Sequence, residues 1–276
     1  VVNHAGKTIL FSDGTGEATI FDPKDLGDGL PETTTHSNKE AHHGVAVRLD
    51  NGELLSTFGD SESAHGVTAF DADGEKIAGS KECPGTHGEA TAKNEAVAFG
   101  CEDGILLYED GKFSKVDSPD KYGRIGNQAG HHDSPYVLGD YKTDPDAELE
   151  RPEQVSITDT TSGKLKLVDL GTSYSFQSLD RGPHGEGLVL GTDGKLHVID
   201  MKAGEVTESF PVIDKWKEPI DWQQTRPSLY VRDHTAFVTS PEDKKVFAVD
   251  THTGEIEAET ELAKAPNEIT GVMGGH

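Results

Sequence analysis

The sequence predicts an all-β protein, a β-propeller of four-stranded blades, and three observations carry this prediction. The 276 residues include 32 glycines and 13 prolines at 33% hydrophobic content, a turn-rich composition that favours many short strands over long helices. Short alternating segments that end in acidic turns recur along the chain. Their spacing of about 40 to 50 residues is the range for propeller blades. No heptad or linker interrupts the pattern, so we expect one domain over residues 1–276.

The second and third strands of the blades are the clearest elements. Each second strand ends in an acidic turn, as in KTILFSDGTG (7–16), EAVAFGCEDG (95–104), GLVLGTDGK (187–195) and TAFVTSPEDKK (235–245). Each third strand follows at once with an apolar pair, an Asp and a Gly turn, as in EATIFDPKD (17–25), GILLYEDGK (104–112), KLHVIDMKAGE (195–205) and KVFAVDTHTGE (245–255).

The innermost strands complete the blade count. We predict them at HHGVAVRL (42–49), THGEATAK (86–93), GRIGNQAG (123–130), SYSFQSLD (173–180), RPSLYVRD (226–233) and NEITGVMG (267–274), with Val1–His4 as the end of another. About six blades are visible. If Val1–His4 ends an inner strand, we expect the native domain to extend upstream of Val1, where a seventh or eighth blade would find its sequence; otherwise the strand at 267–274 closes the ring against the N-terminal strands.

Charge and hydropathy exclude two classes of partner. The 50 acidic and 25 basic residues give a formal charge of -25, which repels nucleic acid phosphates and anionic membranes. No stretch is long and apolar enough to cross a bilayer. Such a surface concentrates cations, although solubility alone also explains it.

The two cysteines, Cys83 and Cys101, are predicted to form a disulfide. In a propeller, the loop before the inner strand and the turn between the second and third strands emerge on the same face, and these cysteines occupy those two places in one blade. A bridge would suit an oxidising compartment. Two free thiols, or a pair of zinc ligands, remain the alternatives.

The placement of the 13 histidines points to a metal site, because neutral imidazole is the commonest protein ligand for zinc at neutral pH. His43 and His87 stand at the same repeat position, where two adjacent inner strands begin. His65 lies before a third strand and therefore on the same face. We predict that these three bind one zinc ion, with His42 as a substitute or supporting residue.

A second group of histidines lies at the turns from inner to second strands, on the opposite face. His131, His132 and Asp133 offer a weaker metal site there, since adjacent side chains rarely converge on one ion. For His184 and His234 we expect hydrogen bonds to a neighbouring blade's backbone. The remaining histidines are expected to be solvated: His36, His197, His252 and His276.

Five segments resemble the AztD family of extracytoplasmic zinc metallochaperones: VVNHAGKTILFSDGTGEATIFD, EAHHGVAV, AHGVTAFDADG, CPGTHGEATA and NEITGVMGGH. The resemblance covers the whole chain. It implies a periplasmic propeller that binds Zn²⁺ and passes it to the solute-binding protein of a zinc ABC transporter. Such proteins often carry a histidine-rich N-terminal region, which is not in this sequence. The sequence therefore supports no zinc capture or transfer step that would use that region.

Two other functions remain open. A propeller enzyme, of the lactonase or quinone-dependent dehydrogenase type, would need carboxylates with Asn or a calcium site near the channel, and carboxylates are abundant here. The sequence has no nucleophile-elbow, zincin, P-loop or dinucleotide motif, so we expect no enzyme. A metal-free interaction scaffold is the third reading, because fold alone does not determine function.

Overall fold

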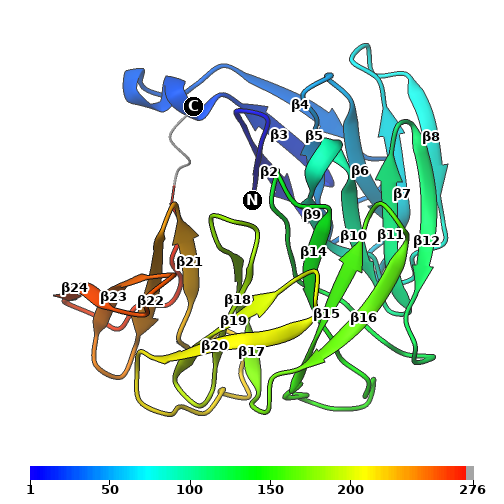
Figure 1. The fold of residues 1–276 in the computed structure, drawn as a ribbon. Helices are drawn as coiled ribbons and strands as arrows, with labels where there is room; N and C mark the ends of the chain where they lie inside the picture. Colours follow the sequence, from blue (N-terminus) through cyan, green and yellow to red (C-terminus); the bar gives the residue numbers. More distant parts are fainter. Residues whose placement is uncertain (272–276) are drawn as a thin grey trace.

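Six four-stranded antiparallel sheets follow one another around a central axis in the computed structural model, which describes residues 1–271 (Figure 1). In each sheet the strands are paired in chain order, so every blade is a simple meander from the inner to the outer strand. The predicted β-propeller is therefore confirmed, with six blades in the described residues.

Each blade contains four strands in chain order. Blade 1 contains β1 (Val2–His4), β2 (Lys7–Ser12), β3 (Glu17–Phe21) and β4 (Thr33–Ser37); blade 2 contains β5 (Ala46–Arg48), β6 (Leu54–Gly59), β7 (Ala64–Phe70) and β8 (Lys76–Ser80); blade 3 contains β9 (His87–Thr91), β10 (Val97–Cys101), β11 (Gly104–Glu109) and β12 (Lys112–Asp117). Blade 4 contains β13 (Gln128–Ala129), β14 (Tyr136–Asp140), β15 (Gln154–Asp159) and β16 (Lys164–Asp169); blade 5 contains β17 (Tyr174–Arg181), β18 (Gly187–Gly191), β19 (Lys195–Asp200) and β20 (Glu205–Pro211); blade 6 contains β21 (Leu229–Arg232), β22 (Thr235–Ser240), β23 (Lys245–Asp250) and β24 (Ile256–Glu261). Two 3-10 helices lie in connections between strands of the described residues, Pro23–Asp28 between β3 and β4 and Lys93–Glu95 between β9 and β10.

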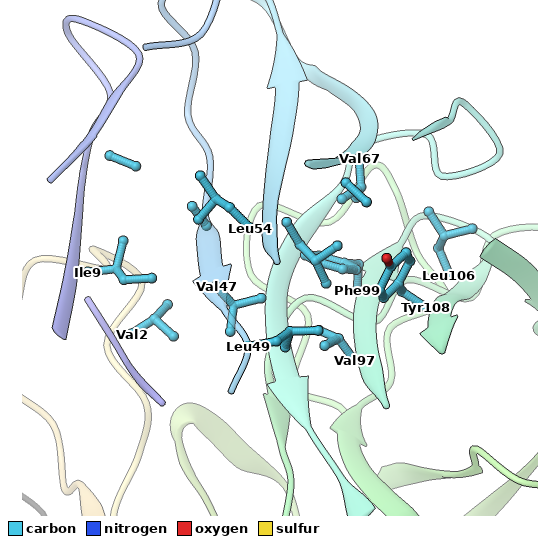
Figure 2. Close-up of a cluster of buried hydrophobic side chains, with 14 of the residues drawn as sticks. Val2, Ile9, Val47, Leu49, Leu54, Val67, Val97, Phe99, Leu106 and Tyr108 are labelled. Carbon is cyan, nitrogen blue, oxygen red and sulfur yellow. The ribbon is translucent and has the colours of Figure 1, made fainter. Parts of the chain in front are cut away.

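The core lies between the blades. A cluster of buried side chains runs through blades 1 to 3 and includes Ile9, Val47, Phe99 and Leu106 (Figure 2). Strand β10 is buried along its whole length, because both of its faces pack against neighbouring sheets rather than one facing water. Removing a fully buried ring such as Phe99 would cost about 3 to 5 kcal/mol.

Side chains of the second strands fix the starts of several inner strands. The Thr57 hydroxyl accepts a hydrogen bond from the Val45 amide, the Asp140 carboxylate accepts from the amides of Gly126 and Asn127, and the Thr239 hydroxyl accepts from the Ser228 amide. These bonds replace ladder bonds that a neighbouring backbone would make. The two bonds to Asp140 explain why β13 covers only two of the eight residues predicted at 123–130.

The last predicted inner strand, 267–274, is wrong over 267–271, where the chain forms no strand; its other three residues lie outside the described part of the chain. Within residues 1–271 no helix is long and apolar enough to span a membrane.

Each connection between blades leads from an outer strand to the next inner strand, so these connections share one face of the ring with the turns between second and third strands. We call it the histidine face, because it carries His43 and His87. The turns from inner to second strand and from third to outer strand lie on the opposite face.

Candidate metal centre

His43 and His87 meet on the histidine face, as their matching repeat positions predict. His43 lies in the loop between β4 and β5, and His87 is the first residue of β9. Their Nε2 atoms are 3.1 Å apart, and their ring centroids are 4.9 Å apart. Two zinc ligands at 2.0 to 2.1 Å in a tetrahedron are separated by roughly 3.3 Å. The two nitrogens therefore already have nearly the spacing that one zinc ion requires.

Hydrogen bonds at the other ring nitrogens aim both Nε2 lone pairs at this gap. His87 Nδ1 lies 2.7 Å from the Gly126 carbonyl oxygen, which can only accept, so this nitrogen carries the proton. His43 Nδ1 lies 2.7 Å from Asp13 Oδ2, and an ionised carboxylate likewise only accepts. In two neutral rings both Nε2 atoms are then unprotonated. Two unprotonated nitrogens this close repel each other unless a cation lies between them. That cation is either a metal ion or a proton carried by His43.

Asp13 is a residue of the candidate centre that the sequence did not lead us to expect. It lies in the turn between β2 and β3, thirty residues from His43. A carboxylate that holds the Nδ1–H of a zinc-binding histidine fixes the ring and raises its basicity. The signal was present in the sequence, because the SDGTG turn falls on the histidine face and offers a carboxylate beside the His43 loop.

Glycine follows both histidines for a steric reason. A Cβ at Gly88 would lie 2.5 Å from the Gly126 carbonyl oxygen that His87 binds, and the glycine has φ of +67°. A Cβ at Gly44 would lie 2.3 Å from Thr57 Oγ1 and 2.6 Å from His42 Nε2. The repeated His-Gly pair thus lets the backbone approach the neighbouring strand closely enough to hold the imidazoles.

Burial lowers the pKa of His87, and the nearby charge of Arg124 lowers it further, whereas the bond to Gly126 acts in the opposite direction. The lowered pKa keeps the ring neutral near pH 7, and neutral imidazole is the form that binds a metal.

The ring nitrogens of His42 and His65 bond to other residues and not to His43 or His87. His42 is buried, and its two ring nitrogens lie 3.0 Å from the Glu40 carbonyl and from Thr57 Oγ1. His65, the second residue of β7, bonds through Nε2 to Asp60 at 2.8 Å. The hydrogen bond from His65, together with those from the Glu62 and Ser63 amides, lowers the pKa of Asp60 to about 2.

The second predicted site, His131, His132 and Asp133, brings its three side chains closer together than we expected of adjacent residues. Within residues 1–271, these residues form a group of potential metal ligands. Their ligand atoms all lie within 4.8 Å of one another. The two rings stack with centroids 4.6 Å apart, and His132 Nε2 lies 3.1 Å from Asp133 Oδ2. This cluster lies on the opposite face, at the β13–β14 turn, and His132 and Asp133 are exposed.

Four histidines depart from their predicted surroundings. His197 is buried, with ring nitrogens bonded to Asp193 and Ser209, and His36 is half-buried against Phe70. The expectation that both are solvated is wrong. The rings of His184 and His234 lie 5.4 Å apart and pack against each other across two blades rather than bonding to backbone. His252 is exposed as predicted, and His276 lies outside the described residues.

The disulfide is confirmed. Cys83, in the loop before β9, is bonded to Cys101 at the end of β10, and both are fully buried. The Thr86 hydroxyl donates to the Cys83 carbonyl, so the bridge fixes the segment that leads directly into His87.

Together these features define a β-propeller with a paired-imidazole centre on one face of the ring. The chain is 27% identical, over 99% of its length, to the zinc chaperone AztD of Citrobacter koseri. It spans 65% of the length of that relative. No family model matches the chain.

Solved structures agree. Apo AztD from Citrobacter koseri superposes with a TM-score of 0.79 at 25% identity, covering 96% of this chain and 72% of that one. A second crystal structure of Citrobacter koseri AztD gives 0.78 at 25% identity over 99% of this chain and 74% of that one. The designed Ika8 protein, 14% identical with a TM-score of 0.63 over 100% of this chain and 77% of that one, shares the fold. The resemblance to AztD predicted from the sequence is confirmed.

Proposed function

We propose that this protein is a zinc metallochaperone that holds Zn²⁺ between His43 and His87 and delivers it to the solute-binding protein of a zinc ABC transporter. The observation that carries the proposal is the pair of Nε2 atoms 3.1 Å apart, with each Nδ1 bonded to an acceptor. The relative's name, zinc chaperone, supports both the metal and its transfer. It also favours a carrier over the lactonase, dehydrogenase and scaffold alternatives.

Two imidazoles leave two tetrahedral positions for other ligands. We propose His65 as a third ligand, which requires its ring to leave Asp60, with His42 supporting the loop from beneath. A position open to water or to an incoming ligand distinguishes a donor from a closed structural site. Such a vacancy lets an acceptor bind the ion before the donor releases it.

The disulfide supports an extracytoplasmic, periplasmic location, since disulfides persist in oxidising compartments. Direct transfer would suit that location, because an ion released to water is lost to competing ligands.

The test is a set of single alanine variants. His43→Ala and His87→Ala should each weaken zinc binding by at least about a hundredfold, since loss of even a supporting partner of a ligand weakens binding about 10- to 100-fold. Competition titration against a chelator of known zinc affinity measures this. His252→Ala, an exposed histidine, is the matched control and should bind zinc like the parent.

The same titration distinguishes the two candidate centres. If His43→Ala and His87→Ala bind zinc as tightly as the parent, the centre on the histidine face is excluded. The cluster His131, His132 and Asp133 is then the next site to substitute.

A further inference from the structure

The long loop 212–228 joins β20 to β21 and therefore lies on the histidine face. It exposes two large apolar side chains, Ile220 at 60% and Trp222 at 71%. Within residues 1–271, the other exposed large apolar side chains lie elsewhere: Val1, Leu10, Leu26, Leu30, Ile77 and Ile256. Ile220 and Trp222 are two residues apart on one loop, and Trp is among the side chains enriched at the hot spots of protein interfaces.

Buried polar contacts hold this loop in one shape. The Arg226 guanidinium, fully buried, donates to Glu218 Oε1 at 2.8 Å and to the Asp221 carbonyl at 2.9 Å, and it lies over the Phe176 ring. Arg151 donates to the Glu218 carbonyl at 2.9 Å. The residues that flank Trp222 are thereby fixed before any partner arrives, which reduces the entropy lost on binding.

The base of this loop is connected to the metal centre through blade 4. Trp222 and Arg226 line a small cavity together with Asp140. Asp140 accepts a hydrogen bond from the Gly126 amide, and the Gly126 carbonyl accepts from His87. Asp140 therefore lines the cavity at Trp222 and also holds the segment whose Gly126 carbonyl binds His87.

The turns between second and third strands carry an excess of carboxylates on the same face. Acidic residues there are Asp13, Asp60, Glu62, Glu102, Asp103, Asp144, Asp146, Glu148, Glu150, Glu153, Asp193, Glu242 and Asp243, against the basic residues Lys142, Arg151 and Lys244. A partner that approaches this face meets a negative rim, so electrostatic complementarity calls for cationic side chains around its own metal site.

We infer that Trp222 and Ile220 are the docking contact for the protein that accepts the zinc. This inference rests on the proposed function. Transfer by ligand exchange requires the acceptor's ligands to reach an ion held by His43 and His87, which confines the acceptor to the histidine face. The acceptor is a folded protein with an apolar depression for the indole and a basic rim around its metal site.

The experiment compares two acceptors of zinc from the loaded protein. One is the metal-free solute-binding protein of a zinc ABC transporter, which must dock; the other is a small chelator, which need not. Trp222→Ala should slow transfer to the protein by at least about tenfold at subsaturating acceptor, as expected for loss of an interface hot spot. Its zinc affinity and its rate of loss to the chelator should equal those of the parent.

Ile220→Ser is the second variant and should slow transfer in the same direction. Leu30→Ala is the matched control, because Leu30 is fully exposed in the β3–β4 connection on the opposite face. Transfer by Trp222→Ala at the parental rate, or an equal slowing with the chelator, would overturn the docking inference while zinc binding by the parent still supports the proposed function. A parent that does not bind zinc, or does not pass it to the solute-binding protein, overturns both.

Discussion

Breaking the bridge between Cys83 and Cys101 should destabilise the protein by an amount that follows from the length of chain it closes. The two residues are 18 positions apart. In the chain-entropy treatment, cross-linking a loop of this length removes about 3 kcal/mol of conformational entropy from the unfolded state. We therefore expect reduction to lower the free energy of unfolding by about 3 kcal/mol, on the condition that the folded structure is otherwise unchanged.

Urea unfolding, followed by tryptophan fluorescence, measures this loss. The oxidised protein is compared with protein that was unfolded, reduced and refolded under reductant. The variant Cys83→Ala/Cys101→Ala should lose more than reduction alone, because both sulfur atoms are fully buried in the core cluster of blades 1 to 3 and their removal leaves a cavity. Coincident unfolding midpoints for the oxidised and reduced proteins would refute the reasoning.

Two further predictions concern charged side chains. Asp13→Asn should weaken zinc binding by about 10- to 100-fold, measured by chelator competition, while leaving the urea midpoint within error; unchanged affinity would show that the carboxylate does not support His43. Arg226→Met should leave Glu218 buried without its cation, at a cost of about 3 kcal/mol at pH 8. Burial already raises the pKa of Glu218, and without Arg226 it should rise further, so the loss should shrink as pH falls through that folded-state pKa; equal losses in urea unfolding at pH 5 and pH 8 would contradict this.

The local sequence determines most of the fold, because each blade is a meander whose hairpins use nearby residues. The second strand 7–12 and third strand 17–21 are predicted within a few residues, since the turn signal and the alternating apolar residues agree. Inner strands are predicted less well. At 123–130 the backbone amides bond to the Asp140 side chain, and no local pattern shows that a distant carboxylate replaces the ladder.

The candidate centre shows the same limit. The repeated His-Gly pair predicts that His43 and His87 share a face, and the structure brings them into contact. It also gives His42, next in sequence to His43, a buried position between Glu40 and Thr57. Which of two adjacent imidazoles points outward depends on packing against the neighbouring strand. The role of Asp13 could not be predicted either, because it depends on how closely blade 1 approaches the loop before blade 2.

The proposed centre takes its parts from four successive blades, which couples metal binding to the assembly of blades 1 to 4. Asp13 comes from blade 1, His43 from the loop that leads into blade 2, His87 from blade 3 and the Gly126 carbonyl from the segment that leads into blade 4. In the unfolded chain the two imidazoles are separated by more than forty residues and have neither acceptor to fix them. Zinc should therefore bind the folded ring far more tightly than the unfolded chain, and its binding free energy adds to the stability of blades 1 to 4. A donor built this way stays ordered when the ion leaves, because the Asp13 and Gly126 contacts hold the imidazoles in the absence of metal.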